Sequence, residues 1–298
     1  MSIDTPTYHD RPVLKEPVWI WSVPVYFYLG GMSGAAATLG AAARLAGDDL
    51  DGLVARCRQI AAAGSVAGSV FLVIDLGRPE RFLNMLRVFR PTSALSVGSW
   101  VLAAHGGAST AAAALSGRGR FASAMGDLAG AASGVTGLPM SGYTGVILGD
   151  TAIPLWHAAR RSLPVLFVAS AASSASAALE AMDLSEGEHR VVRRFGLAAK
   201  VFELMAMRAV ERDAAVIERV GRPLKEGLSG SLWRAARSAA MGSLALGAVP
   251  RAGKRRRALA AVLGSAASLA LRAALFQAGK TSSRDPRATF EQQRKEMP

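Results

Sequence analysis

Apolar positions in this chain form long continuous runs separated by short polar segments, unlike the alternating pattern of a strand. A hydrocarbon core of about 30 Å is crossed by about 20 mostly apolar helical residues. Continuous, alanine-rich runs favour helices over the strands of a membrane barrel. The pattern therefore predicts an all-α, polytopic transmembrane helical bundle of about eight spans. The expected spans are 18–44, 55–76, 95–116, 125–148, 163–182, 191–211, 230–249 and 256–277, with polar segments at 1–17 and 280–298.

The later spans are more polar than the first five. The sixth contains Lys200, Glu203 and Arg208, which predicts either a polar-faced helix buried among others or an amphipathic helix at the interface. A structural ion pair is the simpler interpretation of these charges, and a proton path is the alternative. Arg234, Arg237 and Arg272 are equally ambiguous, because long side chains near span ends can snorkel.

Composition agrees with a membrane protein. Of the 298 residues, 51% are hydrophobic and only 19% are charged, which disfavours a compact water-soluble enzyme. The 31 glycines and the tracts of alanine and serine let helix backbones approach closely within lipid. A single cysteine, Cys57, and four histidines exclude a disulfide framework and a Cys-ligated metal cluster built in this chain.

The formal charge of +13 raises the question of nucleic acid binding. Most basic residues, however, fall in short segments between apolar runs, where they set topology and meet anionic lipid, so we expect no nucleic acid partner. With an even number of spans, both termini lie on one side, and the summed loop charge places them in the cytoplasm of a multi-pass cell-membrane protein. The basic run RAGKRRR at 251–257 contradicts this orientation locally.

Three ordered segments carry a more specific pattern. They read WIWSVPVYFYLGGMSGAAATLG at 19–40, DLGRPERFLNMLRVFRPTSALSVGSW at 75–100, and SGYTGVILGDTAIPLWHAARRSLPVLFVASAASSASA at 141–177. The middle segment combines two Arg-Pro steps, an Asp at the membrane edge and a short amphipathic piece. Together the segments resemble the NrfD-type polysulfide reductase membrane-subunit family.

The resemblance implies an eight-helix, haem-free subunit that reacts with menaquinone or another quinone within a molybdopterin oxidoreductase complex of the formate dehydrogenase, polysulfide or sulfite type. In such complexes a ferredoxin-like iron–sulfur subunit docks on the membrane protein, and a molybdopterin catalytic subunit completes the electron-transfer pathway. The quinone is expected within a first four-helix bundle, residues 18–150, followed by a second bundle at 151–279. This chain is then not a complete enzyme alone.

The histidines independently disfavour a haem anchor. Haem b between helices needs axial ligands at membrane depth, usually His pairs from facing spans. Of the four histidines, only His105 lies well inside an expected span.

Several polar side chains are expected in one layer on the terminal side. Trp21 and Tyr26 open the first span, Asp75 ends the second, and Tyr143 lies near the end of the fourth. A quinone head needs hydrogen-bonding groups at its two oxygens, a slot for the ring and a route for protons. Tyr143 is the candidate partner for one oxygen, Asp75 for proton exchange, and the deeper His105 for the other oxygen or a relay.

Each candidate also has a purely structural interpretation. Trp21 fits an interface anchor, and His105 fits a satisfied interhelical hydrogen bond. Asp75 fits an ion pair with Arg78, one turn further on. Arg78 is itself also a candidate residue for quinone binding. Tyr143 is the stronger candidate because its small neighbours leave space beside the ring.

The basic residues at 78–90 have two interpretations, a topology signal in contact with lipid and a docking surface for the iron–sulfur subunit. Two other classes of function stay open for the whole chain. A secondary transporter would show related halves around a midplane site, and no convincing repeat joins 1–150 to 151–298. A membrane anchor without quinone chemistry is compatible with the same residues.

Overall fold

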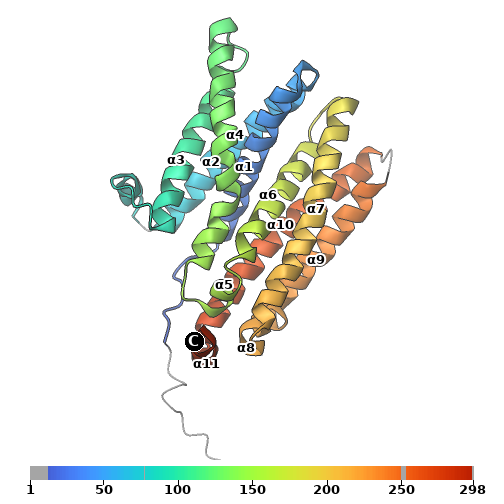
Figure 1. Cartoon of the computed structure of the whole chain (residues 1–298). Coiled ribbons are helices and arrows are strands. Elements are labelled where there is room, and N and C mark those ends of the chain that lie inside the picture. The colour runs from blue at the N-terminus through green and yellow to red at the C-terminus, as the bar shows by residue number, and fades with distance from the viewer. Residues whose placement is uncertain (1–12, 77, 250–252, 297–298) are drawn as a thin grey trace, which may run out of the picture.

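The computed structural model describes residues 13–76, 78–249 and 253–296. Residues 1–12 of the expected polar N-terminal segment, and residues 251–252 of the basic run, lie outside this description. Every regular element within the described ranges is a helix, which confirms the all-α class (Figure 1).

Eight of the described helices have 19 or more residues, and each overlaps one of the expected apolar stretches. By length and composition, α2, α6 and α10 are the described helices that are long and apolar enough to cross a membrane. The eight helices are α1 (Ser22–Ala46), α2 (Asp51–Asp75), α3 (Ala94–Leu115), α4 (Arg120–Gly149), α6 (Ser162–Glu180), α7 (Glu186–Ala215), α9 (Gly227–Ala248) and α10 (Lys254–Ser283).

Consecutive long helices run in alternating directions, so the connections collect at two ends of the molecule (Figure 1). One end, called the terminal face below, holds the segment 13–21, the C-terminus and most of the short helices. These are η3 (Pro79–Leu86), α5 (Pro154–Ala158), α8 (Glu218–Gly221), η4 (Arg222–Leu224) and α11 (Pro286–Glu296). The opposite face holds η2 (Asp48–Leu50), the short links between α3 and α4 and between α6 and α7, the end of α9 and the start of α10.

The start of α7 shows how the opposite face is fixed. Ser185 and Glu188 form a capping box, in which each side chain accepts a hydrogen bond from the other residue's backbone N–H. The Glu188 carboxylate also accepts a hydrogen bond from the backbone N–H of Leu53 at the start of α2. One carboxylate therefore caps its own helix and ties it to α2.

Small residues set the closest helix approach. A Cβ atom on Gly34 of α1 would lie 2.4 Å from the carbonyl oxygen of Gly137 on α4, a distance that no side chain tolerates. The two backbones therefore touch directly, as small residues permit between helices in lipid. This contact holds α4 against α1, and α3 packs on α4 in turn.

The N-terminal helices α1–α4 meet the C-terminal helices α6, α7, α9 and α10 through α1 and α4, which pack on α6, and through α1, which also packs on α10. Trp156 of α5 is fully buried at the terminal end, where its indole N–H donates to the carbonyl of Leu275 on α10 over 2.9 Å. Trp19 stacks on the same indole at a centroid distance of 6.0 Å. The chain before α1 is thereby fastened to the C-terminal helices.

A second tie holds the same segment. The guanidinium of Arg284, just after α10, donates two hydrogen bonds to the Glu16 carboxylate, at 2.7 and 2.9 Å. Lys280 adds a longer ion pair at 3.8 Å. These contacts bring residues more than 260 positions apart in sequence together at the terminal face.

Candidate functional site

A groove with a volume of about 860 Å³ runs along α3, α4 and α6 towards the terminal face. Its wall is mostly apolar and includes Val97, Val101, Pro139 and Val168. Tyr143 of α4 is the aromatic side chain within it. A largely apolar slot with a few polar groups is the usual form of a small-molecule site.

Gly98 of α3 makes room for the Tyr143 ring. A Cβ atom at position 98 would lie 2.3 Å from Cε2 of the ring, so any larger residue would displace it. Sequence reasoning attributed the space around Tyr143 to its neighbours on α4, whereas the decisive small residue lies on the facing helix. Tyr143 also packs against the apolar core cluster that contains Tyr26, Leu102 and Met140.

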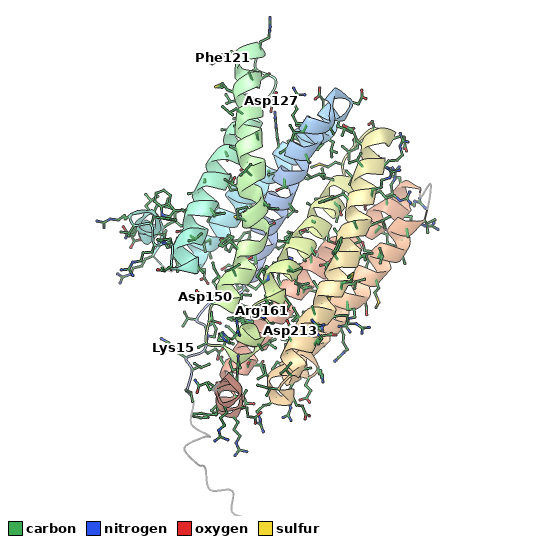
Figure 2. The ribbon with its side chains drawn as sticks, in the orientation of Figure 1. Lys15, Phe121, Asp127, Asp150, Arg161 and Asp213 are labelled. Atoms are coloured by element: carbon green, nitrogen blue, oxygen red, sulfur yellow. The ribbon has the colours of Figure 1, made fainter. Side chains whose placement is uncertain are left out.

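The residues that form the polar rim of this groove were not predicted from the sequence. Thr92 before α3, Asp150 after α4, and Arg160 and Arg161 after α5 line it. Asp150 and Arg161 lie near each other at the terminal end of the molecule (Figure 2). The short helix α5 positions the two arginines. Arg160 lies two residues after its end, and the Arg160 guanidinium donates a hydrogen bond to the carbonyl of His157 at 3.4 Å. The motif WHAARR at 156–161 was the available signal.

Asp75 lies at the end of α2 and accepts a hydrogen bond from the backbone N–H of Ile20 over 3.0 Å. Among the described residues, no ion pair joins Asp75 to Arg78, which is exposed and precedes η3. The carboxylate therefore fixes the start of α1 instead of the loop that follows it. Asp75 stays partly accessible at the terminal face.

Trp21 and Tyr26 have different surroundings. Trp21 is 65% exposed and meets Phe71 of α2 edge-on at 5.9 Å, as an interface anchor would. Tyr26 is buried between α1 and α2 beside Gly30 and Gly68, and its hydroxyl has no hydrogen-bond partner among the described residues. A buried unpaired hydroxyl is uncommon and marks a group available to a ligand or water.

His105 is fully buried among α1–α4. Its Nε2 lies 2.8 Å from the Ser33 hydroxyl and its Nδ1 lies 3.3 Å from the carbonyl of Ser133. Ser33 also lies 2.8 Å from the hydroxyl of Ser65, and Ser65 lies 3.1 Å from that of Ser109. A chain of hydroxyl groups thus joins four helices through one imidazole.

The six expected residues do not share one cavity. Among them, only Tyr143 lines the groove, and Tyr26 joins it through the common core cluster. His105 lies seven residues beyond Gly98 on α3, about 10 Å deeper at 1.5 Å per residue. Trp21, Asp75 and Arg78 lie where α1 begins and α2 ends.

The C-terminal helices bury charges of their own. Arg272 of α10 is 1% exposed, so it does not snorkel. Its guanidinium donates to the Ser170 hydroxyl at 2.8 Å and lies over the Phe167 ring at 5.4 Å. Lys200 and Glu203 of α7 are also buried, so α7 turns a polar face into the molecule, whereas Arg208 of the same helix is exposed.

The donor set of the Tyr143 groove fits a quinone. An aromatic hydroxyl stands in an apolar slot, and a carboxylate, a threonine and two arginines line the rim. The described residues contain no group of three or more His, Cys, Asp or Glu side chains that would hold a metal ion.

Comparison with known families gives one match. Residues 9–117 match the family model described as "Polysulphide reductase, NrfD". The match extends over α1, α2, η3 and α3 and includes Trp21, Asp75, Arg78 and His105, whereas Tyr143 lies beyond it. No curated protein matches the chain.

Proposed function

We propose, from the match of residues 9–117 to the NrfD polysulphide reductase family model, that this chain is a membrane subunit of an oxidoreductase complex of that family and the subunit that reacts with quinone. It exchanges electrons between a partner iron–sulfur subunit and the membrane quinone pool. Menaquinone is the expected quinone, and the catalytic partner is a molybdopterin subunit of the formate dehydrogenase, polysulfide or sulfite type.

The observation that carries this proposal is the Tyr143 groove beside the family-matched helices. The groove has a volume of about 860 Å³ and mostly apolar walls, which suit a ring with an isoprenoid tail. The Tyr143 hydroxyl donates a hydrogen bond to one ring oxygen. A bound quinone supplies two-electron redox chemistry, and the protein supplies orientation and protons.

The other expected residues act around this slot. Asp75, partly accessible at the terminal face, exchanges protons with the aqueous side. The exposed Arg78, three residues further on, would attract a negatively charged quinone head towards that end. His105 and its serine chain, which lie deeper than the slot, form a proton relay. Tyr26 adds a buried hydroxyl to the same core, and Trp21 anchors the start of α1 at the interface.

The architecture follows from the same proposal. The eight long helices cross the bilayer as two four-helix bundles, and the quinone lies where α3 and α4 of the first bundle meet α6 of the second. The terminal face points to the cytoplasm, so the Arg-rich η3 region receives the iron–sulfur subunit there. Electrons then arrive on the membrane face nearest to Tyr143.

The experiment is quinol titration of the complex purified with its partners while iron–sulfur reduction is followed. Tyr143→Phe removes only one hydroxyl, and we expect kcat/KM for a menaquinol analogue to fall about tenfold, the value of one hydrogen bond to the reacting group. Thr110→Val, which removes an exposed hydroxyl from α3, is the matched control. Unchanged kinetics in Tyr143→Phe would exclude this groove as the reaction site.

The same titration separates the alternatives. A secondary transporter or an anchor without quinone chemistry predicts that quinol reduces no cluster in the wild-type complex. The chain would then still bind its partners, but neither Tyr143→Phe nor Asp75→Asn would change any redox signal.

A further inference from the structure

A second groove lies in the C-terminal helices and shares no lining residue with the Tyr143 groove. It has a volume of about 660 Å³ and is formed by the end of α7, by η4 and by the first turns of α9. This region lies at the terminal face, close to Asp213 in Figure 2. Its cationic lining residues are Arg208, Arg212, Lys225, Arg234 and Arg237.

Helical spacing gathers these cations on facing stripes. Arg208 and Arg212 are four residues apart on α7, and Arg234 and Arg237 are three apart on α9. Residues at these spacings share one face of a helix. The two stripes therefore meet across the groove, where α7 packs on α9 and like charges from the two helices face each other.

The carboxylate in the groove is already engaged. Glu211 accepts a hydrogen bond from the Trp233 indole over 2.6 Å and pairs with Arg237. Arg212 has a neighbouring carboxylate in Asp213, at 3.8 Å. Within the described part of the chain, no ion pair neutralises Arg208, Lys225 or Arg234, and Arg234 donates to the Lys225 carbonyl at 2.7 Å.

The depth of these charges makes this imbalance costly. Arg208 lies seven residues before the end of α7 and Arg234 seven after the start of α9, each about 10 Å along its helix axis, and both side chains are exposed. Exposed apolar side chains flank the same end, among them Val216 and Leu228, which are 57% and 65% exposed. Cations beside an apolar, lipid-contacting surface are stabilised by an anion that is held there too.

We propose that this groove binds the phosphate headgroup of an anionic phospholipid. Arg208, Lys225 and Arg234 hold the phosphate oxygens, and the apolar residues beside them contact the acyl chains. Guanidinium groups match phosphate geometry with two parallel donors, which favours this anion over a carboxylate partner at such a site. A lipid is favoured over soluble phosphate because exposed apolar side chains border the charges.

The test is equilibrium binding to the purified full-length chain in a neutral detergent. The probe is tetraoleoyl cardiolipin, compared with dioleoyl phosphatidylcholine and with inorganic phosphate. We expect cardiolipin to bind more tightly than phosphatidylcholine, and the Arg208→Gln/Arg234→Gln variant to bind cardiolipin at least about tenfold more weakly. The Arg208→Lys/Arg234→Lys variant, which keeps the charge, should retain most of the affinity.

The control removes two arginines at the opposite face, Arg194→Gln/Arg256→Gln, both exposed. It should bind cardiolipin like the wild type. Equal binding by the Gln variant at 208 and 234, or an equal loss in the control, would overturn the proposal. Variant-sensitive binding of inorganic phosphate, with cardiolipin binding insensitive to the same changes, would assign the groove to a soluble anion and also overturn it.

Discussion

The Tyr143 ring packs directly on Gly98, and the absence of a side chain at position 98 determines the shape of the groove. In Gly98→Ala, the new Cβ would overlap the Tyr143 ring, so the ring must move or the helices must separate. Overpacking of this kind costs about 1–3 kcal/mol. We expect a lower melting temperature in detergent and slower quinol oxidation.

Gly107→Ala is the matched control, because it lies on the same helix and its added Cβ would meet nothing within 4 Å. It should be neutral or slightly stabilising, since alanine is the better helix former. If both variants behaved alike, helix propensity and not the Tyr143 contact would explain the effect.

Ser33 is the junction of the hydroxyl chain around His105. Its hydroxyl donates to the Ala61 carbonyl at 2.6 Å and lies beside His105 and Ser65. Ser33→Ala leaves these buried groups short of a partner, at a cost of about 1–3 kcal/mol in stability. Thermal unfolding should show this loss, whereas Thr110→Ala, an exposed position on α3, should leave the transition unchanged.

The sequence was sufficient for some of these residues and not for others. A histidine inside an apolar span and a tyrosine among glycines can be recognised from local pattern. The partner of Asp75 could not, because the Ile20 N–H that replaces Arg78 is 55 positions away in sequence. Arg272 was equally hidden, since its burial depends on Ser170 and Phe167 from α6.

At the scale of elements, the segment 13–21 is held to the end of α10 by one carboxylate. The hydrogen bonds from Arg284 lower the pKa of Glu16, against partial burial, and the charges of Arg284 and Lys280 lower it further. A lowered pKa in the folded state means that this stabilisation is present above the ordinary glutamate pKa of about 4.3. It is lost as the pH falls through the lower, folded-state value.

Glu16→Gln should therefore melt at a lower temperature than the wild type at pH 7, by on the order of 1 °C. The difference should disappear at a pH below the folded-state pKa, where the wild-type carboxyl is also neutral. Glu218→Gln on the same face, an exposed position without an ion pair among the described residues, should show no difference at either pH. A difference for Glu16→Gln that persists in acid would contradict the ion-pair explanation.

The segment around η3 is the element that the proposed partner would contact. It is fastened to α3 by Ser99, whose hydroxyl donates to the Met85 carbonyl, and by Ser96, whose hydroxyl donates to that of Val88. Arg87 and Arg90 remain exposed on it. We expect Arg87→Glu/Arg90→Glu to weaken binding of the iron–sulfur subunit about tenfold or more, with a strong dependence on salt.

Co-purification and titration with the isolated partner measure this effect. Arg118→Glu/Arg120→Glu makes the same charge change at the opposite face and should leave binding intact. Equal loss of partner binding in both variants would indicate a general effect of net charge. No loss of binding in either variant would contradict docking and favour lipid contact as the role of Arg87 and Arg90.

Hydrophobic pattern located the long helices well, because each must offer an apolar surface over its whole length. Their ends were placed less accurately. The expected span 125–148 became α4 (Arg120–Gly149), and 191–211 became α7 (Glu186–Ala215), since polar residues continue the hydrogen-bonded spiral beyond the apolar run. The short helices α5 and α8 have too few residues to show a period, and α11, PRATFEQQRKE, is too polar to show an apolar run.

For the whole molecule, one experiment tests both how many helices cross the bilayer and on which side the termini lie. Basic residues lie at both faces, including Arg255 and Arg256 opposite the termini, so loop charge alone leaves the direction weakly determined. The native Cys57 is fully buried, and replacing it with alanine gives a background for single-cysteine labelling. Four exposed positions report on the connections: 118, 161, 183 and 226.

In intact cells, a membrane-impermeant maleimide should label Arg118→Cys and Asp183→Cys, which lie at the opposite face. Arg161→Cys and Glu226→Cys, at the terminal face, should react only after the membrane is opened. This pattern requires α4, α6 and α7 each to cross the bilayer, because consecutive positions alternate in accessibility. A fully reversed pattern would keep the crossings and move the partner and the quinone entry to the outer side. Two consecutive positions labelled together would mean that the helix between them does not cross, and the two-bundle arrangement would fail with it.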